Sequence, residues 1–158
     1  RVSMTKYDST HDVSHRVGDV LALEHEIGID NIDIYKGFSQ NLIDIKNDCI
    51  KFLLNAKKEG LKVAGYGAAA KASTLLNYAG ITTDLVSFIA DKSPSKVGKY
   101  IPGCRIPILG VGELIKFDPD YIIIFPWNIK NEIIADLSPK LSKKVRFFQL
   151  APEVVLLQ

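Results

Sequence analysis

The segment VAGYGAAAKASTLLNYAG, residues 63–80, carries the clearest structural signal in the sequence. The short apolar run over 63–67 predicts a β-strand, and residues 69–78 predict a helix that ends at Gly80. A strand that passes through a glycine-rich turn into a helix is the first unit of a parallel sheet covered by helices. We therefore expect an α/β fold from residue 61 onward.

The rest of the chain continues this alternation of strands and helices. We expect strands over 85–90, 106–109, 121–125 and 145–150, and helices over 111–116 and 129–137. The continuous apolar run over 121–125 is typical of a strand that is buried on both faces, as parallel sheets require. The pattern predicts a Rossmann-like parallel sheet with helices on both faces.

The first 60 residues have a different, purely helical periodicity. Apolar residues recur at helical spacing from Val13 to Ile27, before Gly28, and again from Phe38 to Ala56, before Gly60. We expect two N-terminal helices that are amphipathic and packed on another surface. The predicted division is a helical extension over 1–60, followed by a ligand-binding domain over 61–158.

Composition excludes several classes of protein. The chain has 158 residues, 47% of them hydrophobic, which is enough for the core of one domain. Its 20 basic and 18 acidic residues leave a net charge of +2, without the basic surface of a nucleic-acid binder. No apolar run approaches the roughly 18 residues of a membrane span. Cys49 and Cys104 lack CxxC spacing, which favours a reducing cytoplasm and disfavours a disulfide scaffold or zinc ribbon. His11 and His15 have helical metal-pair spacing, but no third ligand is evident, so we predict no metal site.

The turn between the first strand and its helix has the GxGxxG/A pattern of a phosphate-binding loop. Gly65 permits the tight turn, Gly67 lets a phosphate approach the backbone, and the helix N-terminus adds partial positive charge. Lys71 adds a full charge, and Asp91 stands where a ribose-binding carboxylate is expected. Two alternatives remain open, in which the small residues serve only close packing and Asp91 braces the following turn.

Two further segments are expected at the same edge of the sheet. The connection over 91–103 is long and contains three lysines, two serines and a tyrosine, which suggests a binding loop rather than an ordinary solvated one. Trp127 and Asn128 follow the strand over 121–125, where an aromatic ring and an amide could hold a base or a sugar. An equal alternative makes Trp127 a core anchor and Asn128 a helix N-cap.

Three blocks of sequence together resemble a known family. GYGAAAKASTLLNYAGI, IADKSPSKVGKYIPGCRIPI and PDYIIIFPWNIKNEI are similar, in this order, to the C-terminal domain of SAM-dependent nucleotide-sugar C-methyltransferases. The resemblance covers residues 12–152. It implies a nucleotide-sugar ligand, with dTDP as the expected carrier. The substrate-binding residues expected in this sequence are Gly65, Tyr66, Gly67, Ala68, Lys71, Asp91, Ser93, Lys96, Tyr100, Trp127 and Asn128.

The same resemblance implies a division of labour within a longer polypeptide. In the family, an N-terminal part binds zinc through cysteines and a middle domain binds SAM and holds the catalytic residues. Neither a cysteine cluster for zinc nor the family's catalytic motif occurs here, so we expect no catalytic residue and no cofactor in this chain. We expect the SAM-binding domain of the same polypeptide to be its partner. Ala72-Ser73 replaces a common Gly-Asn, so the exact sugar and nucleotide stay open. The final Pro-x-Pro is replaced by Ala151-Pro152-Glu153-Val154, which affects only the tail. The rival hypotheses are an NAD(P)-binding oxidoreductase domain and a non-catalytic interaction module.

Overall fold

The computed structural model describes residues 4, 6–8, 10, 12–141 and 145–157. The chain divides into two compact units, residues 1–40 and residues 41–158. The sequence placed the start of the ligand-binding domain at residue 61, whereas the sheet-containing unit already begins at residue 41. The functional roles assigned to the two segments stay predictions.

The first unit contains the helix α1 (His15–Ile27) and the short 3-10 helix η1 (Ile32–Tyr35). The Ser14 side chain accepts a hydrogen bond from the Arg16 amide at the start of α1, and Gly28 ends the helix at φ 77°. No residue of α1 is buried. Its apolar side chains were expected to pack on another surface, yet the described residues leave them exposed.

The helix α2 (Phe38–Lys58) carries the chain into the second unit. Its buried residues are Cys49, Leu53 and Ala56, which recur at helical spacing and pack into the core beside the sheet. The Cys49 thiol donates a hydrogen bond to the carbonyl of Leu150, and burial raises its pKa to about 12. This cysteine is therefore a structural residue of the core and not a nucleophile.

The sheet has six strands in the order β3-β2-β1-β4-β5-β6. The first five are parallel, which confirms the predicted α/β class with a mostly parallel sheet. The strands are β1 (Val63–Tyr66), β2 (Ile89–Asp91), β3 (Ile108–Gly110), β4 (Tyr121–Ile124), β5 (Arg146–Gln149) and β6 (Val155–Leu157). The strand β6, which pairs antiparallel with β5, was not predicted from the sequence. The strand β2 is shorter than the predicted 85–90, because the amides of Leu85 and Val86 close a turn onto the carbonyl of Thr82.

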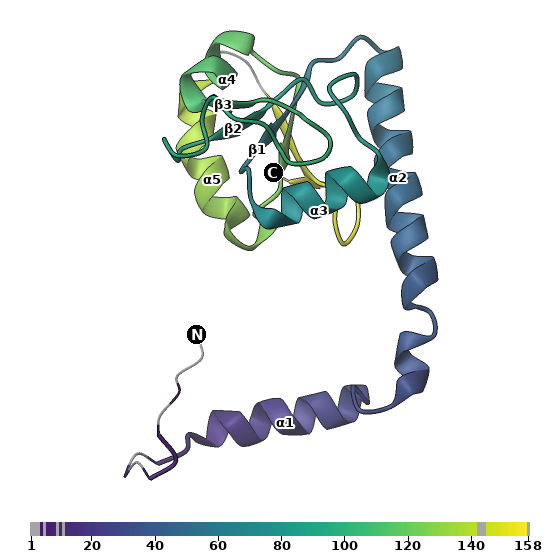
Figure 1. Ribbon diagram of the computed structural model, residues 1–158, viewed down its shortest axis with the longest axis vertical. Coiled ribbons are helices and arrows are strands. Elements are labelled where there is room, and N and C mark those ends of the chain that lie inside the picture. Colours follow the sequence, from purple (N-terminus) through teal and green to yellow (C-terminus); the bar gives the residue numbers. More distant parts are fainter. Residues whose placement is uncertain (1–3, 5, 9, 11, 142–144, 158) are drawn as a thin grey trace. The chain divides into compact units, whose positions relative to one another are not determined.

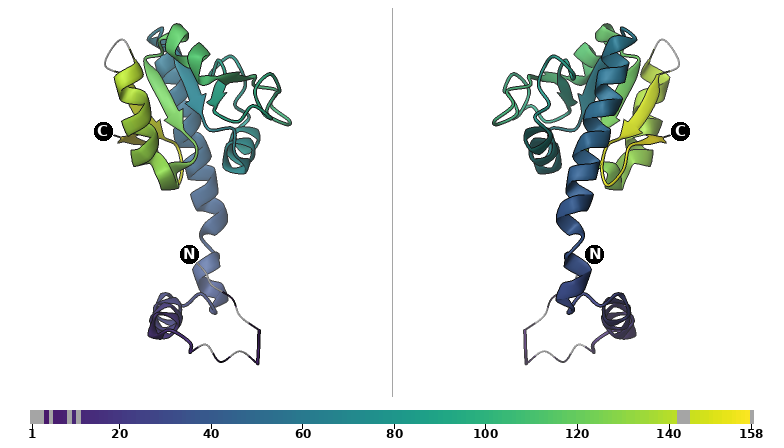
Figure 2. Two further views of the ribbon diagram at one scale, coloured as in Figure 1. Left: turned by 90° about the vertical axis from the view of Figure 1, so that its left-hand side faces the viewer. Right: turned by 90° about the vertical axis from the view of Figure 1, so that its right-hand side faces the viewer.

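Helices cover both faces of the sheet. The remaining helices are α3 (Ala70–Ala79), α4 (Val111–Phe117) and α5 (Lys130–Leu137), with the 3-10 helices η2 (Trp127–Ile129) and η3 (Ser138–Lys140). One core cluster joins α2 and α3 to the sheet, and the other joins α4 and α5 to the opposite face (Figure 1). The turned views show the sheet between these layers (Figure 2). No helix among the described residues has the length and apolar character that crossing a membrane requires.

Candidate functional site

The glycine turn after β1 is packed against the end of β4. Gly67 has φ 90°, and a Cβ atom there would lie 2.5 Å from the ring of Pro126. A Cβ on Gly65 would lie 2.7 Å from the Phe125 ring. Both positions therefore need glycine for packing, as the alternative interpretation proposed, and Gly67 also needs it for its backbone conformation. Approach of a phosphate to this turn stays a prediction.

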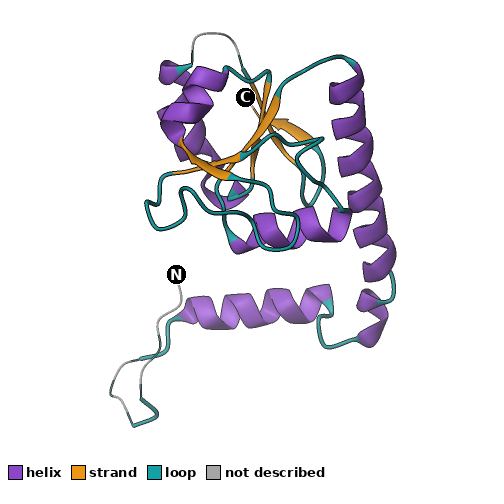
Figure 3. Cartoon of the chain, turned by 45° about the horizontal axis from the view of Figure 1, so that its top comes forward, coloured by secondary structure: helices purple, strands orange, loops and turns teal. Residues whose placement is uncertain are grey.

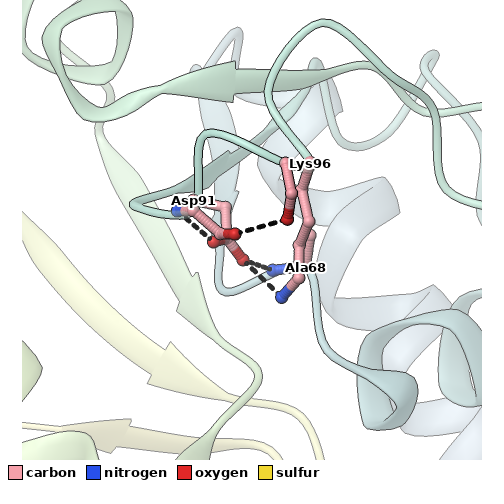
Figure 4. Close-up of polar contacts among 5 residues, drawn as sticks. Ala68, Asp91 and Lys96 are labelled. Carbon is pink, nitrogen blue, oxygen red and sulfur yellow. Dashed lines mark hydrogen bonds and ion pairs between the residues drawn. The ribbon is translucent and has the colours of Figure 1, made fainter.

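Asp91, the last residue of β2, connects the glycine turn to the long loop that follows it (Figure 4). Its Oδ2 atom accepts a hydrogen bond from the Ala68 amide at 2.8 Å and lies 3.2 Å from the Lys96 ammonium. Its Oδ1 atom accepts from the Ser93 amide at 2.8 Å. Both oxygens of this buried carboxylate are thus engaged within the protein. This geometry favours a bracing role for Asp91 over a role in ribose binding. Ribose binding by Asp91 stays a prediction.

The charge of Asp91 is stabilised by these contacts. Burial alone raises the pKa of a carboxyl group, but the amides of Ser93 and Ala68 and the Lys96 ammonium more than offset it. The pKa of Asp91 therefore lies below its usual value. The brace is an ionised carboxylate at neutral pH.

The far end of the long loop is fixed to α3 by the side chain of Asn77. Figure 3 shows in teal the loops that connect the strands and helices. The Asn77 Nδ2 atom donates to the Pro102 carbonyl at 2.8 Å and to the Ser73 carbonyl at 2.7 Å. Gly103, at φ 85°, leaves no room for a Cβ atom beside the Asn77 side chain. Sequence reasoning missed Asn77, because a polar residue on a helix gives no local sign that its partner lies 25 positions later.

Between these two attachments lies a pocket of about 510 Å³, which we call the polar pocket. The first turn of α3 forms one wall and the long loop forms the other. Its polar lining residues are Ser73, Thr74, Ser95, Lys96, Lys99 and Tyr100, and no acidic residue lines it. A helix N-terminus, hydroxyl groups and two ammonium groups suit a phosphate or diphosphate. Of these residues the sequence had singled out only Lys96 and Tyr100.

Lys71, Trp127 and Asn128 lie together, but outside the polar pocket. The Lys71 ammonium lies 4.2 Å from the centre of the Trp127 ring and donates to Asn128 Oδ1 at 3.0 Å. Lys71 and Trp127 line a separate apolar groove of about 460 Å³ between α2 and α3. Asn128 is not a helix N-cap, since the N-cap of α5 is Ile129, and Trp127 is only partly buried. Both parts of that alternative were wrong.

The remaining candidates lie on the other side of the glycine turn or away from the site. Tyr66 is buried at the end of β1, and Lys92 pairs with Asp136 at 2.8 Å. His11 lies outside the described residues, and His15 is on the exposed surface of α1. Within the described part of the chain, no group of three or more His, Cys, Asp or Glu side chains is arranged to hold a metal ion.

Comparison with known proteins gives two matches. Residues 1–152 match the family model described as the C-methyltransferase C-terminal domain. The C-methyltransferase NovU of Streptomyces niveus is 32% identical over 143 residues, which cover 90% of this chain and 34% of NovU. The chain thus spans about a third of the length of this curated relative.

Proposed function

Since this chain belongs to the family of C-methyltransferase C-terminal domains, we propose that it is the substrate-binding portion of a SAM-dependent C-methyltransferase. Its ligand is a nucleotide-linked keto-deoxysugar, held by a Rossmann-like domain that follows two N-terminal helices in the sequence. SAM and zinc bind to the part of the polypeptide that corresponds to the rest of NovU, and that part is its partner. The chain alone is catalytically silent, and the complete enzyme works in the cytoplasm.

The observation that carries this proposal is the polar pocket. A nucleotide-sugar presents two negative charges on its diphosphate, and the pocket offers Lys99 and the N-terminus of α3 without a carboxylate among its lining residues. Lys96 also lines the pocket, with its ammonium 3.2 Å from the Asp91 carboxylate. The Tyr100 ring, 63% exposed, is available to stack on a base. The asymmetry of charge favours a diphosphate over an uncharged ligand.

The oxidoreductase alternative is less well supported. An NAD site of this type uses the carboxylate at the end of the second strand to bind ribose hydroxyls. Here Asp91 already accepts bonds from two backbone amides and Lys96. These three bonds use most of the roughly four acceptor positions of the carboxylate, which leaves little capacity for ribose hydroxyls.

Calorimetry with dTDP-glucose, dTDP, NAD and SAM tests the proposal. We expect the two thymidine nucleotides to bind, and Lys96→Ala and Lys99→Ala each to weaken them roughly tenfold, because a charge-assisted bond to phosphate is lost. Lys71→Ala is the matched control, since Lys71 lines the apolar groove instead. NAD binding without nucleotide-sugar binding would overturn the proposal. A loss confined to Lys71→Ala would move the diphosphate to the other side of α3.

A further inference from the structure

A third cavity, of about 250 Å³, opens at the carboxyl ends of β1 and β4. The chain runs from β1 toward β2 and β3 on one side, whereas β4 and β5 lie on the other, so the strand order reverses here. Ligands of open α/β sheets bind outside the carboxyl ends of the strands at such a point. We call this cavity the switch-point hollow. Its polar lining residues are Tyr66, Asp91, Lys92, Glu132 and Asp136.

Tyr66 brings a hydroxyl group to this hollow. The residue is only 6% exposed, and its hydroxyl oxygen is not among the buried side-chain atoms that lack a hydrogen-bond partner. Burial raises the pKa of the Tyr66 hydroxyl, which is therefore protonated at neutral pH. At the wall of a cavity, this hydroxyl can donate a hydrogen bond to an oxygen acceptor supplied from outside the chain.

The charges around the hollow define the ligand further. Three carboxylates line the hollow, those of Asp91, Glu132 and Asp136. The Lys96 ammonium pairs with Asp91, and the ammonium groups of Lys92 and Lys140 pair with Asp136. The charges around the hollow therefore offset one another, which disfavours a phosphate, whereas a carboxylate can accept a hydrogen bond from a hydroxyl group. The volume is below the roughly 300–1,000 Å³ of pockets for drug-sized ligands. A small, uncharged and hydroxylated ring fits both conditions.

The hollow and the polar pocket lie on either side of the glycine turn. Gly67 lines the hollow, and the next residue, Ala68, lines the polar pocket. The Asp91 carboxylate borders the hollow on one side and binds the Ala68 amide on the other. A ligand with a diphosphate in the polar pocket therefore needs to cross only this turn to place its next group in the hollow.

We propose that the switch-point hollow binds the sugar ring of the nucleotide-sugar, with Tyr66 donating to a sugar oxygen and Glu132 accepting from a sugar hydroxyl. The nucleoside diphosphate lies in the polar pocket. This inference rests on the proposed function and adds the subsite that distinguishes a nucleotide-sugar from the bare nucleotide.

The test measures what the sugar adds to binding. The dissociation constants of dTDP and dTDP-glucose, and of UDP and UDP-glucose, are determined by calorimetry for the wild type, Tyr66→Phe and Glu132→Gln. Tyr66→Phe keeps the ring and removes only the hydroxyl, so it should weaken the sugar nucleotide roughly two- to tenfold and leave the bare nucleotide unchanged. Glu132→Gln, at an exposed position, should act in the same direction. Tyr78→Phe, on the far part of α3, is the matched control.

Each outcome separates this subsite from the proposed function. A sugar advantage that Tyr66→Phe reduces, with thermal stability unchanged, supports the subsite. Equal binding of bare and sugar nucleotides by the wild type, or an advantage that neither variant alters, overturns the subsite and leaves the proposed function standing. Equal weakening of both ligands by Tyr66→Phe assigns the tyrosine a structural role and also overturns it. Failure of all four nucleotides to bind overturns the proposed function itself.

Discussion

Replacing Asp91 by asparagine removes the charge that holds the two walls of the polar pocket together. The carboxylate accepts bonds from the Ala68 and Ser93 amides, both at 2.8 Å, and lies 3.2 Å from Lys96. Asparagine keeps one carbonyl oxygen and so can accept from only one of these amides. Its NH₂ group then faces the other amide, which becomes a buried donor without an acceptor.

The expected loss of stability follows from the hydrogen bonds that the two backbone amides donate, rather than from the ion pair with Lys96. A hydrogen bond to a charged group contributes about 1.5–3 kcal/mol. The Lys96 side chain is 43% exposed, and ion pairs at that exposure contribute little. We therefore expect Asp91→Asn to lower the free energy of unfolding at pH 7 by about 2–3 kcal/mol. Urea unfolding followed by circular dichroism measures this difference.

The pH dependence provides a second readout. Because the pKa of Asp91 is lowered in the folded state, its stabilising contribution is complete above the unfolded-state pKa of about 3.9 and is lost as the pH falls through the folded-state pKa. The difference between wild type and variant should be constant from pH 7 to pH 5 and shrink below about pH 4. Asp84→Asn, at a carboxylate that is 55% exposed, is the control and should cost far less. Equal stability of wild type and Asp91→Asn at pH 7 would refute the bracing role.

Two further predictions concern the glycine turn and catalysis. Gly67→Ala should lower the free energy of unfolding by more than Gly98→Ala, because both positions have positive φ but only the Cβ atom at 67 meets another group, Pro126. Urea titration should give a cost of about 1–2 kcal/mol for Gly98→Ala and a larger one for Gly67→Ala, and equal costs would contradict the packing argument. Incubation of the chain alone with SAM and a dTDP-keto-sugar should yield no methylated product by mass spectrometry, and product above a no-protein control would falsify this prediction.

The mostly parallel sheet could be predicted because its signals are local. The continuous apolar run that became β4 indicates burial on both faces, and Gly80 marks the end of α3 with φ 68°. The strand β6 gave no such signal, since it has three residues and only Leu157 is buried. Its pairing with β5 depends on the path of the connecting turn, which short-range periodicity does not encode.

The candidate site was predictable in its location but not in the direction of its side chains. The glycine turn, Asp91 and the long loop meet at one edge of the sheet, as parallel topology requires. Lys71, however, follows the turn on a helix, and the rotation of α3 places it against Trp127 rather than in the polar pocket. Ser73, Thr74 and Lys99 line that pocket for the same geometric reason, which depends on packing and not on a motif.

The connection between β2 and β3 is fastened near both ends, by Asp91 to the Ser93 amide and by Asn77 to the Pro102 carbonyl. For protein engineering, this makes the intervening residues an exchangeable cassette. A library that varies Ser95, Lys99 and Tyr100 would present new side chains to the cavity while the anchor points keep the backbone in place. In a library that also varied the anchoring residues Asp91 and Asn77, most variants would no longer form the cavity.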